Sequence, residues 1–219
     1  VDIVKKLLNS RGFNQGLTLS VQSLDLDVLE NIGIADAIPS TLEYLLPKGC
    51  KLDANGRLLF PRSLIEDTIA MAGRNFPLYG QDPKHDMEPW GTNTYFGTAG
   101  AAVYIADPET GDYRESVSQD AYDIARLVDQ MEHIHFYQRA VVPRDIPEAS
   151  AMDINTCYLS VSGTTKHVGT SWVHPDHLVE SIKMLHEIAG GEDKWRARPF
   201  VSQSNCFVVP PLKFASDAC

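Results

Sequence analysis

DAYDIARLVDQMEHIHFYQRAVV, residues 120–142, is the stretch that decides the fold. Its first part, residues 120–132, has apolar residues at the spacing of an amphipathic helix, and Ser116 and Gln119 before it have the spacing of a capping box. Its second part, residues 133–142, predicts an extended run. A helix that passes directly into a strand is typical of an α/β protein.

The same alternation continues along the rest of the chain. Helices are predicted over residues 147–163 and 174–191, and short strands over residues 166–172 and 199–209. Strands that alternate with helices favour a parallel sheet built from βαβ units. Because a closed eight-stranded barrel takes about 250 residues, residues 118–219 are predicted to be the first part of a TIM-type (β/α)8 barrel. The chain is therefore expected to be a truncated piece of a longer polypeptide.

Two regions precede the predicted barrel. Residues 1–85 are predicted to be a mainly helical N-terminal region, with helices over residues 24–37 and 61–76 and a turn at Asn55-Gly56 between them. Residues 86–117 place aromatic and β-branched residues around a DPETG turn, which predicts a hairpin cap. The glycines of this hairpin either serve turn and bulge geometry or let the backbone approach a ligand closely.

The composition limits the class of protein. The chain has 43% hydrophobic and 22% charged residues, as an ordinary globular protein does. Its formal net charge of -10 argues against a nucleic-acid partner, and no apolar run approaches the roughly 20 residues of a membrane span. The four cysteines are scattered and form no CxxC motif, which favours a cytoplasmic protein without a disulfide framework.

Two histidines suggest a metal site at first sight. His133 and His135 are two residues apart, so both side chains lie on one face of a strand, as in many metal-dependent barrel hydrolases. Both precede the apolar run, however, whereas the chemistry of parallel barrels gathers at the C-terminal ends of the strands. The sequence favours polar residues at the lower rim of the barrel, and a metal-dependent TIM-barrel hydrolase remains the alternative.

Several longer segments resemble one known family. The most extensive is GTAGAAVYIADPETGDYRESVSQDAYDIARLVDQMEHIHF, residues 97–136, with PKGCKLDANGRLLFPRSLIEDTI and FPLYGQDP upstream. Further segments are Asp145-Ile146-Pro147, Thr165-Lys166 and Pro210-Pro211-Leu212. In their order and spacing, over roughly residues 20–217, these segments resemble the trimethylamine methyltransferase family.

The resemblance implies a TIM-barrel enzyme that moves a methyl group from a methylated amine to the cobalt of a corrinoid. The corrinoid is expected on a separate partner protein, with no metal bound directly, and a homo-oligomer is compatible with a barrel of this size. Trimethylamine enzymes of the family use pyrrolysine, whereas relatives without it act on quaternary amines such as glycine betaine. Both substrates stay open, as does a non-catalytic protein that binds quaternary amines.

A quaternary ammonium has no N–H to donate, so rings are its natural ligands through cation–π contacts. The substrate-binding candidates with aromatic rings are Tyr95, Phe96, Tyr137, Trp172 and Phe207. The candidates for a substrate carboxylate are Arg114, Lys166, His167, Gln203 and Asn205. Each ring could instead belong to the core, and Arg114 and Lys166 could serve structural ion pairs. No catalytic residue is assigned.

Overall fold

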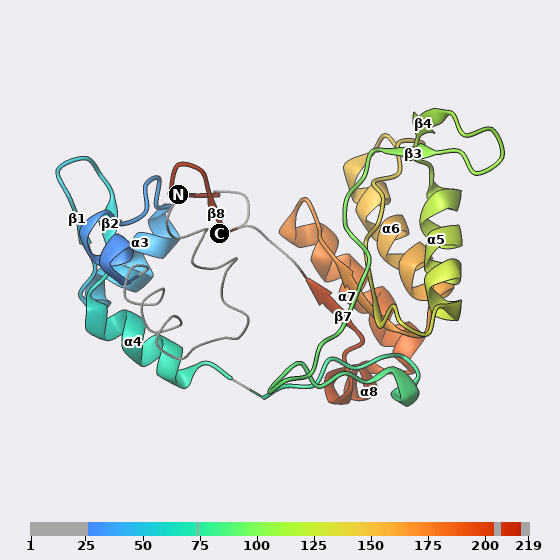
Figure 1. Ribbon diagram of the computed structural model, residues 1–219. Coiled ribbons are helices and arrows are strands. Elements are labelled where there is room, and N and C mark those ends of the chain that lie inside the picture. The colour runs from blue at the N-terminus through green and yellow to red at the C-terminus, as the bar shows by residue number, and fades with distance from the viewer. Residues whose placement is uncertain (1–25, 74, 204–206, 216–219) are drawn as a thin grey trace. The chain divides into compact units, whose positions relative to one another are not determined.

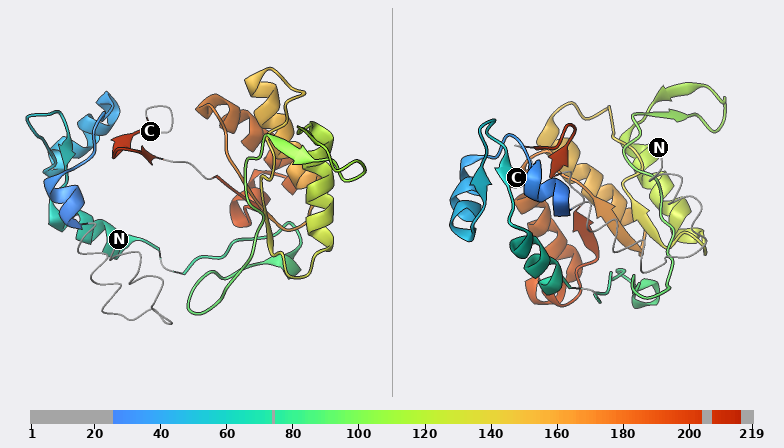
Figure 2. Two further views of the ribbon diagram at one scale, coloured as in Figure 1. Left: turned by 45° about the horizontal axis from the view of Figure 1, so that its top comes forward. Right: turned by 60° about the vertical axis from the view of Figure 1, so that its left-hand side comes forward.

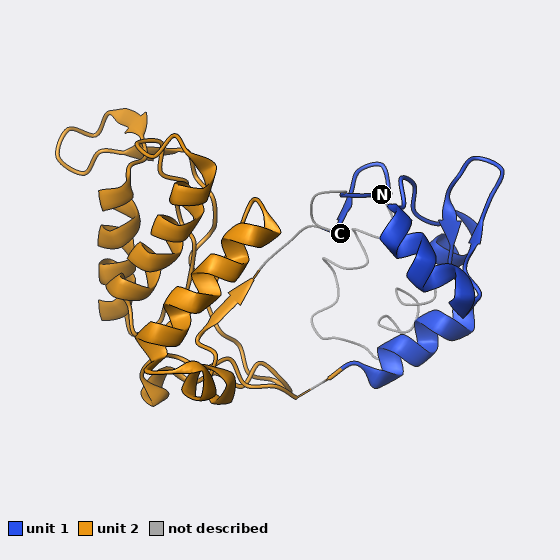
Figure 3. Ribbon diagram, turned by 180° about the vertical axis from the view of Figure 1, so that it is seen from behind, with its two compact units in different colours: residues 1–72, 206–219 blue, residues 73–205 orange. Residues whose placement is uncertain are grey.

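The computed structural model describes residues 26–73, 75–203 and 207–215. The chain divides into two compact units, residues 1–72 with 206–219 and residues 73–205 (Figure 3). The predicted division at residues 85 and 117 stays a prediction. Within the described ranges, none of the helices has both the length and the apolar character needed to cross a bilayer.

The first unit contains short helices and two small antiparallel hairpins. After a helical segment at residues 26–31 come α3 (Pro39–Leu45), the 3-10 turn η1 (Leu46–Lys48), β1 (Lys51–Leu52), β2 (Leu58–Leu59), α4 (Arg62–Met71), β8 (Val208–Val209) and β9 (Lys213–Phe214). The extended element with a turn at Asn55-Gly56 is confirmed by the pairing of β1 with β2. The helix predicted over residues 24–37 is too long, because Gly33 has φ +66° and a Cβ there would lie 2.3 Å from the Leu58 carbonyl oxygen.

The second unit is built on a parallel sheet with the order β5-β6-β7. Figure 1 labels its strand β7 and its four helices. Its strands are β5 (Phe136–Gln138), β6 (His167–Thr170) and β7 (Val201–Gln203), and its helices are α5 (Ser118–Gln130), α6 (Ala149–Gly163), α7 (Pro175–Ala189) and α8 (Glu192–Ala197). The predicted α/β class and parallel sheet are confirmed. The three strands form an open sheet within the described residues, so a closed barrel stays a prediction.

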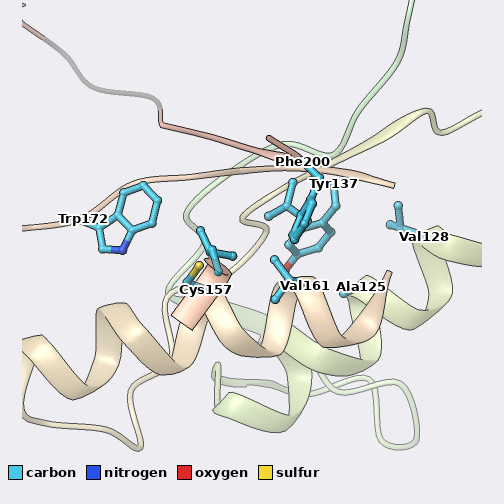
Figure 4. Close-up of a cluster of buried hydrophobic side chains, with 9 residues drawn as sticks. Ala125, Val128, Tyr137, Cys157, Val161, Trp172 and Phe200 are labelled. Carbon is cyan, nitrogen blue, oxygen red and sulfur yellow. The ribbon is translucent and has the colours of Figure 1, made fainter. Parts of the chain in front are cut away.

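One face of this sheet packs on the helices. Tyr137, Val168 and Val201 are register neighbours across the three strands, and all three contact the hydrophobic core. The rest of the core comes mainly from the helices and includes Ala125, Val128, Cys157, Val161, Trp172, Leu185 and Phe200 (Figure 4). Cys157 is buried and free, as is Cys50 in the other unit, whereas Cys206 and Cys219 lie outside the described residues.

The predicted hairpin is confirmed and is anchored to α5. Strands β3 (Tyr104–Ala106) and β4 (Tyr113–Glu115) pair antiparallel, and the hairpin projects beside α5 (Figure 2). The predicted capping box is wrong by one position: the Asp120 carboxylate accepts from the Val117 N–H at 2.8 Å, and the Ser116 hydroxyl instead donates to the Val142 carbonyl at 2.8 Å. A polar side chain three residues into the helix still satisfies a free backbone donor.

The glycine-rich stretch before the hairpin lies along the edge of β5. The Ala101 N–H donates to the Arg139 carbonyl at 2.9 Å, and the Val142 N–H donates to the Ala102 carbonyl at 2.8 Å. At Gly97, a Cβ would lie 2.2 Å from the Phe136 ring. The missing side chain of Gly97 therefore lets the backbone approach Phe136 of the neighbouring strand β5 closely, rather than a ligand.

Candidate functional site

Parallel strands bring their C-terminal ends to a single edge of the sheet, where α/β proteins carry their chemistry. The predicted run at residues 133–142 is longer than β5, which ends at Gln138. Beyond Gln138 the Arg139 N–H still donates to the Gly169 carbonyl of β6 at 2.8 Å, and on its other side the chain pairs with residues 101–102. Arg139 therefore lies at the C-terminal edge, next to Ser171, which follows β6.

The Arg139 guanidinium is only weakly bonded. Its Nη1 donates to the Ser171 carbonyl at 3.4 Å, and this is its one hydrogen bond among the described residues. No carboxylate in the described part of the chain lies within ion-pair distance of it, although the side chain is half-buried. Burial lowers the pKa of Arg139, and attraction to Asp153 and Tyr137 partly offsets this effect.

Asp153 supplies the negative charge at the same edge. It is 1% exposed, and its Oδ2 accepts from the Val173 N–H and from the His177 Nδ1–H, both at 2.7 Å. These bonds tie α6 to the start of α7 and fix the orientation of the His177 ring. The Asp153 Oδ1 and the nearby Thr156 hydroxyl have no hydrogen-bond partner among the described residues.

We call Arg139, Asp153, Ser171 and His177 the C-terminal-edge cluster. It brings together a guanidinium, a carboxylate and an oriented imidazole from segments that follow β5 and β6. Such a set can bind a group of either charge and can hold a ligand in a fixed orientation. His177 lies in the first turn of α7, and the sequence patterns singled out neither Arg139 nor Asp153. A charged residue directly after the predicted strand residues Phe136 and Tyr137 and the polar Gln138 was the available signal for Arg139.

Two of the predicted ring ligands lie in the core. Tyr137 is fully buried, with its hydroxyl donating to the Ala121 carbonyl at 3.3 Å and accepting from the Ala140 N–H at 3.3 Å. Trp172 is 8% exposed, and its Nε1–H donates to the Ser181 hydroxyl at 2.8 Å. Both rings are core residues, which was the alternative considered for each of them. A contact with substrate stays a prediction.

Tyr95, Phe96 and His135 gather at the opposite edge of the sheet. The Tyr95 and His135 rings are 5.3 Å apart and nearly perpendicular, and the Phe96 ring, which is 61% exposed, stacks on His135 at 6.3 Å. Tyr95 and His135 line a cavity of about 320 Å³ that also contacts Lys84 and Lys166. These rings are therefore on the N-terminal side of β5, away from the C-terminal-edge cluster.

The remaining candidates of the late sequence are spread out. Gln203 is the exposed last residue of β7, and Asn205 lies outside the described residues. Phe207, which is exposed, belongs to the other unit. Within the second unit, Tyr95 and Lys166 line one cavity, whereas Tyr137 and Trp172 lie in the core.

Of the two histidines before β5, His135 is hydrogen-bonded to the backbone of Phe96. The His135 N–H donates to the Phe96 carbonyl at 2.7 Å, and the Phe96 N–H donates to His135 Nδ1 at 2.9 Å. His133 and His135 precede the first residue of β5, so they lie at the N-terminal end of that strand, and a barrel rim there stays a prediction. Over the ranges that the structure describes, no three His, Cys, Asp or Glu side chains group as metal ligands would.

Arg114 and Lys166 are fully engaged in structural contacts. The Arg114 guanidinium donates to both Asp120 oxygens and to Asp107, each at 2.8 Å, which holds the pKa of Asp120 below its usual range. The Lys166 ammonium donates to the carbonyls of Val128, Met131 and Ile134 at 2.5–2.6 Å. Both cations stabilise the ends of α5, so neither is free for a substrate carboxylate.

His167 is the first residue of β6 and lies on the face of the sheet away from the helices. Its Nδ1–H donates to the Tyr79 carbonyl at 2.8 Å, because a carbonyl can only accept, and its Nε2 is hydrogen-bonded to the Ser202 hydroxyl at 2.9 Å. Burial lowers the pKa of His167, and the Tyr79 bond offsets part of that effect.

This environment predicts a loss of stability on mild acidification. The pKa of His167 is lower in the folded protein than the ordinary histidine value of about 6.5 in the unfolded chain. As the pH falls below about 6.5, the unfolded chain therefore binds a proton at His167 before the folded protein does, and the free energy of unfolding decreases. His85 contributes in the same window, since burial also lowers its pKa. The His167→Gln variant should show a smaller decrease between pH 7 and 5 in urea denaturation, and replacement of the exposed His133 should leave the wild-type decrease. An unchanged slope in His167→Gln would contradict the assignment.

Comparison with known proteins places the chain in a family. The family model for trimethylamine methyltransferase matches residues 12–219. The trimethylamine methyltransferase MttB of Desulfitobacterium hafniense is 30% identical over 208 residues, which cover 94% of this chain and 42% of that protein. The trimethylamine methyltransferase MttB1 of Methanosarcina acetivorans is 28% identical over 203 residues, which cover 89% of this chain and 40% of that protein. The trimethylamine methyltransferase MttB of Methanosarcina thermophila is 26% identical over 203 residues, which cover 89% of this chain and 41% of that protein.

The chain thus spans about two fifths of the length of these curated relatives. The match runs through both structural units and includes the parallel sheet, the hairpin and the whole C-terminal-edge cluster. On this evidence the chain belongs to the trimethylamine methyltransferase family.

Proposed function

We propose that the complete protein transfers a methyl group from a methylated amine to the cobalt of a corrinoid carried by a separate protein. The observation that carries this proposal is the family match over residues 12–219. We also propose that β5, β6 and β7 are consecutive strands of a (β/α)8 barrel, with α6 and α7 as its crossover helices. The cytoplasmic location and the corrinoid partner are parts of the same proposal.

The reaction needs little from the protein beyond binding and alignment. The C–N bond of the ammonium breaks, its electron pair stays on nitrogen, and a neutral amine leaves. The electron pair of Co(I) forms the new Co–C bond, which gives methyl-Co(III). A quaternary substrate has no proton on nitrogen to remove, so proximity and orientation of one methyl group supply much of the rate.

The C-terminal-edge cluster supports this proposal by its place and by its charge. It lies where parallel barrels carry their chemistry, on the side that a bulky acceptor could approach. Asp153 provides a negative charge that favours an ammonium ion over a neutral amine, and His177 is held in one orientation by that carboxylate. The half-buried Arg139 and His177 would contact the substrate, whereas Asp153, which is 1% exposed, would act through its charge and through His177.

The test uses the complete protein with a reduced corrinoid, both free and bound to a candidate carrier protein. Trimethylamine, tetramethylammonium, choline and glycine betaine are each added, and the visible spectrum is followed. At least one of these amines should convert Co(I) to methyl-Co(III), and omission of the protein should abolish the conversion. Failure with every amine and with both corrinoid forms would reject the proposal. Amine binding without transfer would indicate the non-catalytic alternative.

A further inference from the structure

We propose that the hairpin before α5 is the docking element for the corrinoid carrier protein, which contacts it with a basic surface that has an apolar hollow. This inference rests on the proposed function, which by itself names a carrier but no part of the chain that would contact it. We call residues 103–116, which contain β3, the acidic turn and β4, the hairpin arm. The support comes from the position, the rigidity, the exposed side chains and the charge of this arm.

The hairpin arm stands on the segment that follows β5 at the C-terminal edge of the sheet. Before its first leg, the Ala102 carbonyl accepts from the Val142 N–H at 2.8 Å. On its second leg, the Ser116 hydroxyl donates to the Val142 carbonyl and the Ser116 carbonyl accepts from the Arg144 N–H, both at 2.8 Å. The loop of the arm extends beyond α5 at the upper right of Figure 1. A carrier that brings cobalt to the C-terminal ends of the strands would approach on this side.

Two side chains hold the hairpin arm rigidly. The Asp107 Oδ1 accepts from the N–H groups of Glu109 at 3.0 Å and Thr110 at 3.2 Å, which fixes the turn. The Asp107 Oδ2 accepts from the Arg114 Nε–H at 2.8 Å, and the same guanidinium donates to both Asp120 oxygens of α5. Because the arm is ordered before it meets a partner, binding costs little conformational entropy.

One face of the hairpin arm presents two tyrosine rings to solvent. Tyr104 is 57% exposed and Tyr113 is 84% exposed. The register pairs Tyr104 with Glu115 and Ala106 with Tyr113, so both rings lie on the same face, whereas the half-buried Ile105 lies on the other. Exposed tyrosines on a rigid support are typical anchors of protein–protein interfaces.

The charge of the hairpin arm indicates the kind of partner. The arm contains four carboxylates and one guanidinium. Glu109, Asp112 and Glu115 are exposed, and none of them forms an ion pair within the described ranges, whereas Arg114 is paired with carboxylates. An acidic rim around two rings matches a basic surface with an apolar hollow, and the attraction accelerates association. A second copy of this chain fits less well, since its formal net charge is -10.

The experiment uses the complete protein and two acceptors of the methyl group, free cob(I)alamin and a candidate carrier protein loaded with cobalamin. The double variant Tyr104→Ala/Tyr113→Ala is expected to lower kcat/KM and the calorimetric affinity for the carrier at least about tenfold, and to change transfer to free cob(I)alamin less than about twofold. Tyr158→Ala is the matched control, because Tyr158 is 49% exposed in the half of α6 that leads into the N-terminal end of β6. It should behave as wild type with both acceptors.

A second variant tests the charge of the hairpin arm without touching the rings. Glu109→Gln/Asp112→Asn should raise KM for the carrier about threefold at low salt, because long-range attraction between the two proteins is weakened. Its KM should also rise less with added salt than that of the wild-type protein, since fewer charges remain to be screened. A salt dependence equal to that of wild type would contradict the basic partner surface.

Three further results would overturn the docking proposal. These are an equal loss with both acceptors in the tyrosine variant, which would mean that the arm supports the protein itself, an unchanged KM for the carrier in that variant, and a wild-type protein that does not bind the carrier. A protein that transfers no methyl group to either acceptor rejects the proposed function alone, because calorimetry with the carrier still compares wild type with the tyrosine variant. Circular dichroism of each variant separates unfolding from loss of binding.

Discussion

Replacement of Lys166 by methionine is expected to destabilise the second unit by about 3 kcal/mol, since three charge-assisted hydrogen bonds disappear while their acceptors stay buried. Lys166 is 2% exposed. Its ammonium donates to the carbonyls of Val128, Met131 and Ile134. The first of these is in the last turn of α5 and the other two follow it, where the helix dipole favours a cation. Methionine keeps the aliphatic volume and removes only the charge and the donors.

The measurement is urea denaturation followed by circular dichroism, at pH 7 and moderate salt. Lys84→Met is the matched control, because Lys84 is exposed and its ion pair with Asp82 is a surface contact. That control should change the free energy of unfolding by less than about 1 kcal/mol. If Lys166→Met were as stable as Lys84→Met, the three carbonyls would have other partners and the assigned role of Lys166 would be wrong.

The elements of the second unit could be predicted because their periodic patterns are local. The helix predicted over residues 174–191 matches α7, which ends before Gly190 at φ +80°. Gly190-Gly191 carries that boundary, since glycine adopts the left-handed conformation without strain. The strand predicted over residues 199–209 was wrong in its second half, because residues 208–209 pair with β9 in the other unit. The predicted run therefore crosses from one unit into the other, and its apolar pattern does not mark that boundary.

The residues that line a ligand site were harder to predict. Successive side chains of a strand point to opposite faces of the sheet, so an error of one residue in the register reverses the face that is predicted for each side chain. Tyr137 lies on the helix-covered face, whereas Phe136 and Gln138, its neighbours, point to the other side of β5. Cations present the same difficulty. Arg114 and Arg139 look alike in the sequence, and only their partners show that one is bound to two carboxylates and the other to a single carbonyl.

Replacement of Gly163 by alanine is expected to destabilise the second unit by about 2 kcal/mol through overpacking between α5 and α6. A Cβ at this last residue of α6 would lie 2.5 Å from the Ala125 Cβ and 3.0 Å from the Tyr122 carbonyl oxygen. Ala125 is fully buried and the carbonyl belongs to the helix backbone, so neither can move without a shift of α5. The helix propensity of alanine offsets only part of this cost, about 1 kcal/mol at most.

A double-mutant cycle tests whether this contact is the cause. Ala125→Gly alone should also destabilise the unit, by about 1–2 kcal/mol, from lost helix propensity and a lost buried methyl group. The double variant has alanine at position 163 and glycine at position 125, so only one methyl group occupies the contact. Its free energy of unfolding should exceed the value expected from the sum of the two single effects by at least about 0.5 kcal/mol. Gly73→Ala is the control, because a Cβ at Gly73 meets no atom within 4 Å. Additive effects in urea denaturation would mean that the cost of Gly163→Ala arises elsewhere than at the contact of α5 with α6.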